Sequence, residues 1–156
     1  MIKFTKMQGC GNDFVIVDYE EAVRADIHMD KLAKILCDRH FGVGADGLII
    51  PNTGVKDADI GWFFYNSDGS VAQMCGNGMR CFAKYVYDKK LVDKRSFSVK
   101  TLAGIIQPEI LEDGRVRVNM SKPILESEKI PFLPAKNLNY KIAIKNKIFE
   151  GNAVSM

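Results

Sequence analysis

Residues 74–90 read MCGNGMRCFAKYVYDKK and predict the central helix of the fold. Apolar Met79, Phe82 and Val86 recur at the three- and four-residue spacing of one helix face. A lysine and an aspartate four residues apart favour an ion pair on the other face. The pattern therefore predicts a helix over 77–89 or 77–90, whose apolar stripe must be covered by a sheet.

The residues at the start of this helix favour anion binding and a reactive thiol. Gly76 and Gly78 are poor helix formers, and they leave the first backbone N–H groups open to a ligand. Bare amides at a helix N-terminus bind carboxylate or phosphate groups. A thiol at that position, here Cys75, can become a thiolate near neutral pH. The residues alone leave two roles open for Cys75, a core or capping residue and a catalytic thiolate.

Composition restricts the classes of function. The chain has 156 residues and a formal net charge of +3, spread in mixed-sign patches, which does not favour a nucleic-acid partner. We find no signal peptide and no apolar run long enough to cross a membrane, so we expect a cytoplasmic protein. The cysteines are then expected to be free thiols, and their spacings of 27, 38 and 6 do not fit a zinc site. We predict Cys37 and Cys81 to be buried, and Cys10 to be structural filler.

Alternating and β-branched residues predict strands on both sides of the helix, including 1–7, 13–19, 47–50 and 60–66. A second helix is expected from an N-cap at Asp30 to Gly42. Segments 96–110 and 115–120 predict a β-meander. Prolines at 123, 131 and 134 then mark a linker or domain crossing. We expect an α+β fold with a lobe over 1–118 and the start of a second lobe over 119–156.

Five separated motifs, taken together, resemble the diaminopimelate epimerase family along essentially the whole chain. They are MQGCGNDFVIVD (7–18), DRHFGVGADGLI (38–49), FYNSDGS (64–70), MCGNGMRCFAKY (74–85) and VNM with a following proline (118–123). The resemblance implies two pseudo-symmetric lobes, each a curved antiparallel sheet around a central helix. It also implies a cofactor-free enzyme that interconverts LL- and meso-diaminopimelate, on the route to lysine and peptidoglycan.

The resemblance assigns roles by position. Cys75 would be the acid/base of the first lobe, and the amides of Gly76 and Asn77 would hold the α-carboxylate of the substrate. Asn12 and Asn66 would contact the substrate through their side chains. Family members often have glutamine where this chain has Gly47. The partner cysteine of the family lies beyond residue 156, so we expect an N-terminal half that is inactive alone.

Two other functions are weighed against this one. Proline racemases of the same fold also use two cysteines, but their first motif typically has histidine where this chain has Asn77. Phenazine-type isomerases generally lack the cysteine. A non-catalytic binding module would keep the anion site without the chemistry. The sequence leaves the oligomeric state open, with a homodimer as one alternative because unpaired strand edges tend to associate.

Overall fold

The computed structural model describes residues 1–131 and 137–155. Helix α3 (Gly76–Asp88) is the central helix of residues 1–119. The helix buries Met79, Phe82 and Val86, as the stripe predicts. It begins one residue before the predicted start, because Cys75 is the N-cap and its Sγ accepts a hydrogen bond from the Gly78 N–H. The expected ion pair between Lys84 and Asp88 is present.

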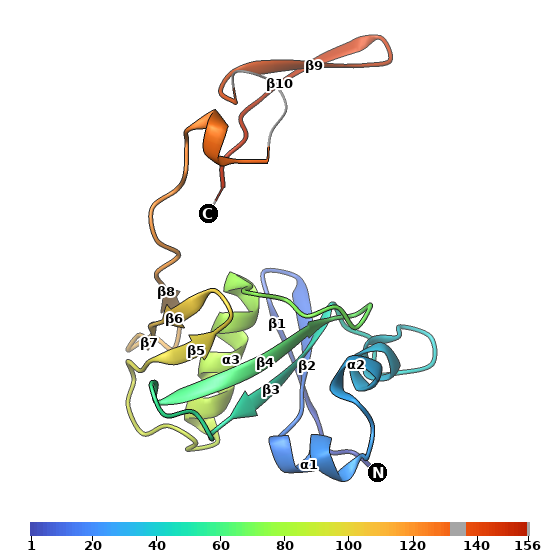
Figure 1. The fold of residues 1–156 in the computed structure, drawn as a ribbon, viewed down its shortest axis with the longest axis vertical. Coiled ribbons are helices and arrows are strands. Elements are labelled where there is room, and N and C mark those ends of the chain that lie inside the picture. Colours follow the sequence, from blue (N-terminus) through green and yellow to red (C-terminus); the bar gives the residue numbers. More distant parts are fainter. Residues whose placement is uncertain (132–136, 156) are drawn as a thin grey trace. The chain divides into compact units, whose positions relative to one another are not determined.

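A six-stranded sheet lies on one side of α3, in the order β1-β2-β3-β4-β5-β6 (Figure 1). Its strands are β1 (Thr5–Gly9), β2 (Asn12–Ile16), β3 (Gly47–Asn52), β4 (Ile60–Asn66), β5 (Val99–Thr101) and β6 (Gly104–Ile106).

The α+β class is confirmed, but the sheet is mixed where an antiparallel one was expected. β2 pairs with β3 and β4 pairs with β5 in parallel, while the other neighbours are antiparallel. Parallel neighbours need a crossover connection, and helices supply it here. Helices α1 (Tyr19–Arg24) and α2 (Met29–Cys37) connect the first parallel pair, and α3 connects the second. The prediction missed this because it did not consider which strands become neighbours.

The two crossovers place helices on opposite faces of the sheet (Figure 1). The first parallel pair runs antiparallel to the second, so right-handed crossovers on the two pairs fall on opposite sides. Alternate residues of β2, and Val17 directly after it, consequently enter two cores. Phe14 and Ile16 pack with α3, whereas Val15 and Val17 pack with residues of α1 and α2.

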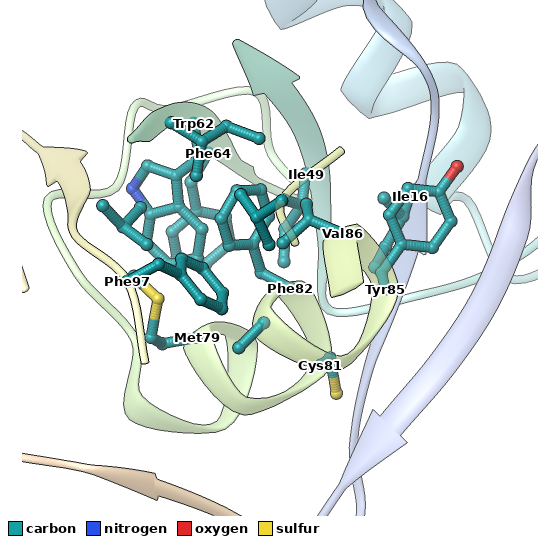
Figure 2. Packing of buried hydrophobic residues seen from close by; sticks show 14 of the residues in the cluster. Ile16, Ile49, Trp62, Phe64, Met79, Cys81, Phe82, Tyr85, Val86 and Phe97 are labelled. Atoms are coloured by element: carbon teal, nitrogen blue, oxygen red, sulfur yellow. The ribbon is translucent and has the colours of Figure 1, made fainter. Parts of the chain in front are cut away.

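The core around α3 is rich in aromatic side chains (Figure 2). The Trp62 ring lies 5.5 Å from the Phe82 ring and 5.1 Å from the Phe64 ring, centroid to centroid. A separate two-stranded sheet, β7 (Pro108–Ile110) and β8 (Val116–Val118), adds side chains to the same cluster. These strands were expected as part of a meander, and they instead form a sheet of their own that contacts α3.

The second helix differs from its prediction at both ends. α2 begins after His28 and ends at Cys37, so Asp30 lies in the first turn. The chain leaves the helix because the Asp38 side chain accepts hydrogen bonds from the next two free backbone N–H groups, at 40 and 41. Short helix α1 was not predicted, since its six residues have too few apolar positions to show a period.

The chain divides into two compact units, Met1–Asn119 and Met120–Met156. The second contains a short 3₁₀ helix, η1 (Ser127–Lys129), and the antiparallel hairpin of β9 (Tyr140–Ile144) and β10 (Lys147–Gly151). Of the three linker prolines, Pro134 lies outside the described residues. Among the described residues, no helix is long and apolar enough to cross a membrane.

Candidate active site

The thiol of Cys75 lies at the N-terminus of α3, where its extended backbone (φ −145°, ψ 117°) turns into the helix. Its half-buried Sγ accepts a hydrogen bond from the Gly78 N–H at 3.4 Å. The S–H donates to Asn12 Oδ1 at 3.5 Å. The thiol is therefore held by groups from two elements that are 63 residues apart in sequence.

The next two backbone N–H groups of the helix point to an anion site. Within the described residues, the amides of Gly76 and Asn77 have no hydrogen-bond acceptor. The next two amides, of Gly78 and Met79, donate to the sulfur and to the carbonyl oxygen of Cys75. Two open N–H groups at the positive end of a 13-residue helix can hold a carboxylate beside the thiol.

Asn12 reaches this site through a tight turn. Cys10 and Gly11 both have positive φ (56° and 82°) between the paired residues Gly9 and Asn12. This is a two-residue hairpin turn whose twist matches that of its strands. Cys10 is exposed at the tip, so its interpretation as structural filler is wrong.

Asn77 completes the group around the thiol. Its Nδ2 donates to Asn12 Oδ1 at 3.5 Å, so that oxygen accepts hydrogen bonds from both residues of the motif. Arg80, one helical turn later, donates to Asn77 Oδ1. The structure thus brings three of the predicted site residues, Cys75, Asn77 and Asn12, into direct contact through their side chains, although only the backbone amide of Asn77 was predicted to act.

Asn66 has a different hydrogen-bond partner. It is the last residue of β4, and its Nδ2 donates to Ser70 Oγ at 2.9 Å. Among the described residues it makes no hydrogen bond to Cys75 or Asn12. It faces Gly47 across the β3–β4 pair. A Cβ at Gly47 would lie 2.8 Å from the Phe64 ring and from the Tyr65 carbonyl oxygen, so the glutamine common in the family would require both to shift.

Charged residues behind Asn12 were missed by the sequence reasoning. Asp46 Oδ2 accepts a hydrogen bond from Asn12 Nδ2 at 2.6 Å, and Arg39 bridges Asp46 and Asp13. The Arg39 guanidinium, together with Lys6, holds the pKa of the Asp13 carboxyl well below its usual range. The signal was present in the motif over 38–49, where two charged residues flank a glycine-rich loop, but their partners could not be read from spacing.

Two other thiols are buried in the core, and one cavity lies away from Cys75. Burial raises the pKa of the Cys37 and Cys81 thiols to about 11, which suits the predicted core role. A cavity of about 650 Å³ lies over β4 and β5, where Val55, Trp62 and Leu102 are part of its lining, and Cys75 is not. Among the described residues, no group of three or more His, Cys, Asp or Glu could hold a metal ion.

Comparisons of sequence identify the relatives. The signature of the family described as diaminopimelate epimerase matches residues 4–126. The diaminopimelate epimerase of Caldanaerobacter subterraneus is 46% identical over 98% of this chain and 56% of its own length. The chloroplastic diaminopimelate epimerase of Oryza sativa is 44% identical over 99% of this chain and 45% of its own length. The chain thus spans about half the length of these relatives.

Solved structures share the fold at low sequence identity. A hydroxyproline epimerase from Agrobacterium vitis matches 96% of this chain and 47% of its own, with a TM-score of 0.63 and 11% identity. A phenazine biosynthesis protein of the PhzF family from Bacillus anthracis matches 79% of this chain and 40% of its own, with a TM-score of 0.57 and 19% identity. The sequence relatives decide the family, and this chain belongs to the diaminopimelate epimerases.

Proposed function

We propose that this chain carries one half of the active site of a diaminopimelate epimerase, with Cys75 as the acid/base on one face of the substrate. The observation that carries the proposal is the half-buried Cys75 thiol beside the open N–H groups of Gly76 and Asn77. Membership of the family supplies the substrate class, an amino acid, and the type of reaction, an isomerisation.

The arrangement suits proton transfer at the carbon next to a carboxylate. With the α-carboxylate on the two open amides, the α-carbon lies near the sulfur. In its thiolate form Cys75 acts as the base: the C–H bond breaks as an S–H bond forms, and the electron pair of the C–H bond moves toward the carboxylate. In the reverse direction the S–H bond of the thiol breaks and its proton passes to the α-carbon. The negative charge that develops there is stabilised by N–H dipoles already aimed at it, an effect that commonly supplies several kcal/mol in enzymes. The chemistry described uses side chains and backbone amides alone.

Inversion of the carbon needs a proton donor on the opposite face. Cys37 and Cys81 are buried, so neither can serve. We assign this role to a second cysteine contributed outside the 156 residues, as the greater length of the relatives supports. The chain alone is then expected to give no epimerisation. We also expect the reaction to take place in the cytoplasm. The Asn66 side chain is expected to contact the substrate.

The proposal is tested in the full-length protein with Cys75→Ser. The variant should lower the kcat of diaminopimelate epimerisation by at least about a thousandfold, because the hydroxyl is too weak an acid and base to replace the thiol. Cys10→Ser is the matched control. Cys10 is exposed and makes no hydrogen bond to Cys75, and a serine hydroxyl can replace its sulfur as the acceptor from Arg80, so the variant should keep wild-type activity. Epimerisation that survives Cys75→Ser would overturn the assignment.

Proline separates the proposal from the racemase alternative. Deuterium incorporation at the α-carbon in D₂O is measured for diaminopimelate and for proline with the same protein. Exchange is expected for diaminopimelate alone. Exchange of proline at the same rate would assign the chain to a different substrate class within the shared fold. Exchange with neither, in a folded full-length protein, would favour a non-catalytic binding role.

A further inference from the structure

The side-chain orientation of Asn12 is set by a carboxylate. The two ends of an asparagine amide differ in function, because the oxygen accepts hydrogen bonds and the nitrogen donates them. An ionised carboxylate can only accept, so the Asn12 nitrogen must be the end that faces Asp46 Oδ2, at 2.6 Å. The oxygen is consequently the end that faces Cys75 and Asn77, each at 3.5 Å.

Asp46 is itself held on three sides. Arg39 Nη2 donates to its Oδ1 at 2.8 Å, and the Asp13 backbone N–H donates to its Oδ2 at 3.1 Å. Its own backbone N–H donates to the Asp13 carbonyl oxygen. The same arginine nitrogen reaches the Asp13 carboxylate at 2.8 Å. The Asp46 carboxylate therefore has little freedom to leave Asn12, although its side chain is 43% exposed.

A second charge fixes the amide on the other side of the thiol. Arg80 has only donors and bonds to Asn77 Oδ1, so the Asn77 nitrogen must turn toward Asn12. With Asn12 in the opposite orientation, two NH₂ groups would face each other and two hydrogen bonds to its oxygen would be lost. Asp46 and Arg80 thus favour the same pair of amide orientations for Asn12 and Asn77 around Cys75.

We propose that Asp46, held by Arg39, is a positioning residue that acts through Asn12 to keep an oxygen acceptor against the Cys75 S–H. The acceptor orients the thiol proton and the sulfur at the end of α3. This inference rests on the proposed function of Cys75 and adds a group that need not touch the substrate. Without the carboxylate at 46, Asn12 is free to rotate, and the thiol loses its fixed acceptor.

A double-mutant cycle between Asp46→Asn and Asn12→Ala tests this role. In the full-length protein, Asp46→Asn should lower kcat about tenfold with KM within about threefold, because the proton-transfer step and not binding is affected. In the Asn12→Ala background, Asp46→Asn should alter kcat by less than about twofold, because the side chain through which Asp46 acts has been removed. Equal losses in both backgrounds would overturn the inference, because a structural role of Asp46 does not depend on Asn12.

Thiol labelling gives a readout that does not need epimerisation. Iodoacetamide should label Cys75 at least about threefold faster in Asp46→Asn than in the wild type, because Asn12 no longer holds the thiol proton. Adding Asp46→Asn to Asn12→Ala should not increase the labelling rate further. Buried Cys81, whose raised pKa does not depend on Asp46, monitors local loosening, and its labelling should not change. Asp57→Asn removes an exposed carboxylate paired with Lys100, away from Asn12, and should leave both readouts at wild-type values.

The outcomes separate the two proposals. If Cys75→Ser keeps activity but the cycle still couples Asp46 to Cys75 labelling through Asn12, the proposed function fails and the positioning role stands. If epimerisation needs Cys75 but the effects of Asp46→Asn and Asn12→Ala add independently in both kcat and Cys75 labelling, only the proposed positioning role of Asp46 is wrong. Should Asp46→Asn fail to fold, Arg39→Lys replaces it in the cycle, since a lysine cannot bridge two carboxylates as arginine does. The same non-additivity with Asn12→Ala is then required.

Discussion

The β3–β4 pair of the first unit and the β9–β10 hairpin of the second are both antiparallel pairs with isoleucine and aromatic residues, yet they differ in burial. Ile49 and Ile50 are fully buried, whereas Ile144 is 54% exposed and Ile148 is 71% exposed. The first pair has helices on both faces, whereas the isoleucine and phenylalanine side chains of the second remain at least 40% exposed. A pair of strands in this chain can therefore form without burying its apolar side chains in a core.

The two units are consequently stabilised by different interactions. In the first, two apolar clusters on opposite sheet faces supply most of the driving force. In the second, the buried polar residue Asn137 ties segments together. Its Nδ2 donates to the carbonyl oxygens of Leu125 and Ala153, at 2.8 and 2.9 Å. A few hydrogen bonds of this kind contribute only about 1 kcal/mol each.

The largest expected effect contrasts one phenylalanine in each unit. Phe82→Ala should lower the free energy of unfolding by about 3–5 kcal/mol, because the side chain is fully buried against Trp62 and leaves a cavity. Phe149→Ala, at a side chain 49% exposed, should cost less than about 0.5 kcal/mol. Urea unfolding of both variants measures the difference. Losses of similar size would mean that the hairpin has a core of its own.

Thiol labelling makes the same contrast kinetically. Burial raises the pKa of the Cys81 thiol to about 11, whereas a cysteine introduced by Ile148→Cys would be exposed on β10. At pH 8, iodoacetamide should label position 148 at least about a hundredfold faster than Cys81, because the thiolate reacts and the buried thiol is seldom ionised. Mass spectrometry of the digested peptides follows both sites in one sample. Rates within about tenfold would show that the first unit opens readily.

Acid should weaken the first unit through Asp59. Its carboxylate accepts hydrogen bonds from Lys94, at 2.6 Å, and from Ser98, and these lower its pKa to about 2. Because the folded pKa lies below the unfolded value near 4, this stabilisation is complete above about pH 4 and is lost as the pH falls toward 2. The exposed setting limits it to about 1 kcal/mol. Asp59→Asn should flatten this part of the profile of unfolding free energy against pH, and an unchanged slope would contradict the assignment.

The smallest expected effect comes from removing the second unit. All members of both apolar clusters lie before residue 119, so residues 1–119 should fold as an independent lobe. Their melting temperature should match that of the 156-residue chain within about 4 °C. In a domain of this size a shift of about 4 °C corresponds to a change of about 1 kcal/mol in the free energy of unfolding. A large fall would show that the proposed lobe over 1–118 needs the residues that follow.

Local patterns determined much of this protein from the sequence alone. The stripe of Met79, Phe82 and Val86 predicted α3 to within about one residue, because helix faces depend on neighbours three and four positions away. The positions of the main strands followed from short runs of β-branched and aromatic residues. The motif around Cys75 indicated both the thiol at the helix end and the open amides next to it.

Only the tertiary structure decided which distant groups meet. Sequence spacing did not reveal that parallel pairing of β2 with β3 sets the Asp13 backbone beside Asp46, 33 residues away. It also did not reveal that Asn66 bonds to Ser70 while Asn12 reaches Cys75. The physical reason is that periodicity reports the face on which a residue lies, whereas the partner of a polar group depends on strand register, which is set by the packing of the whole sheet.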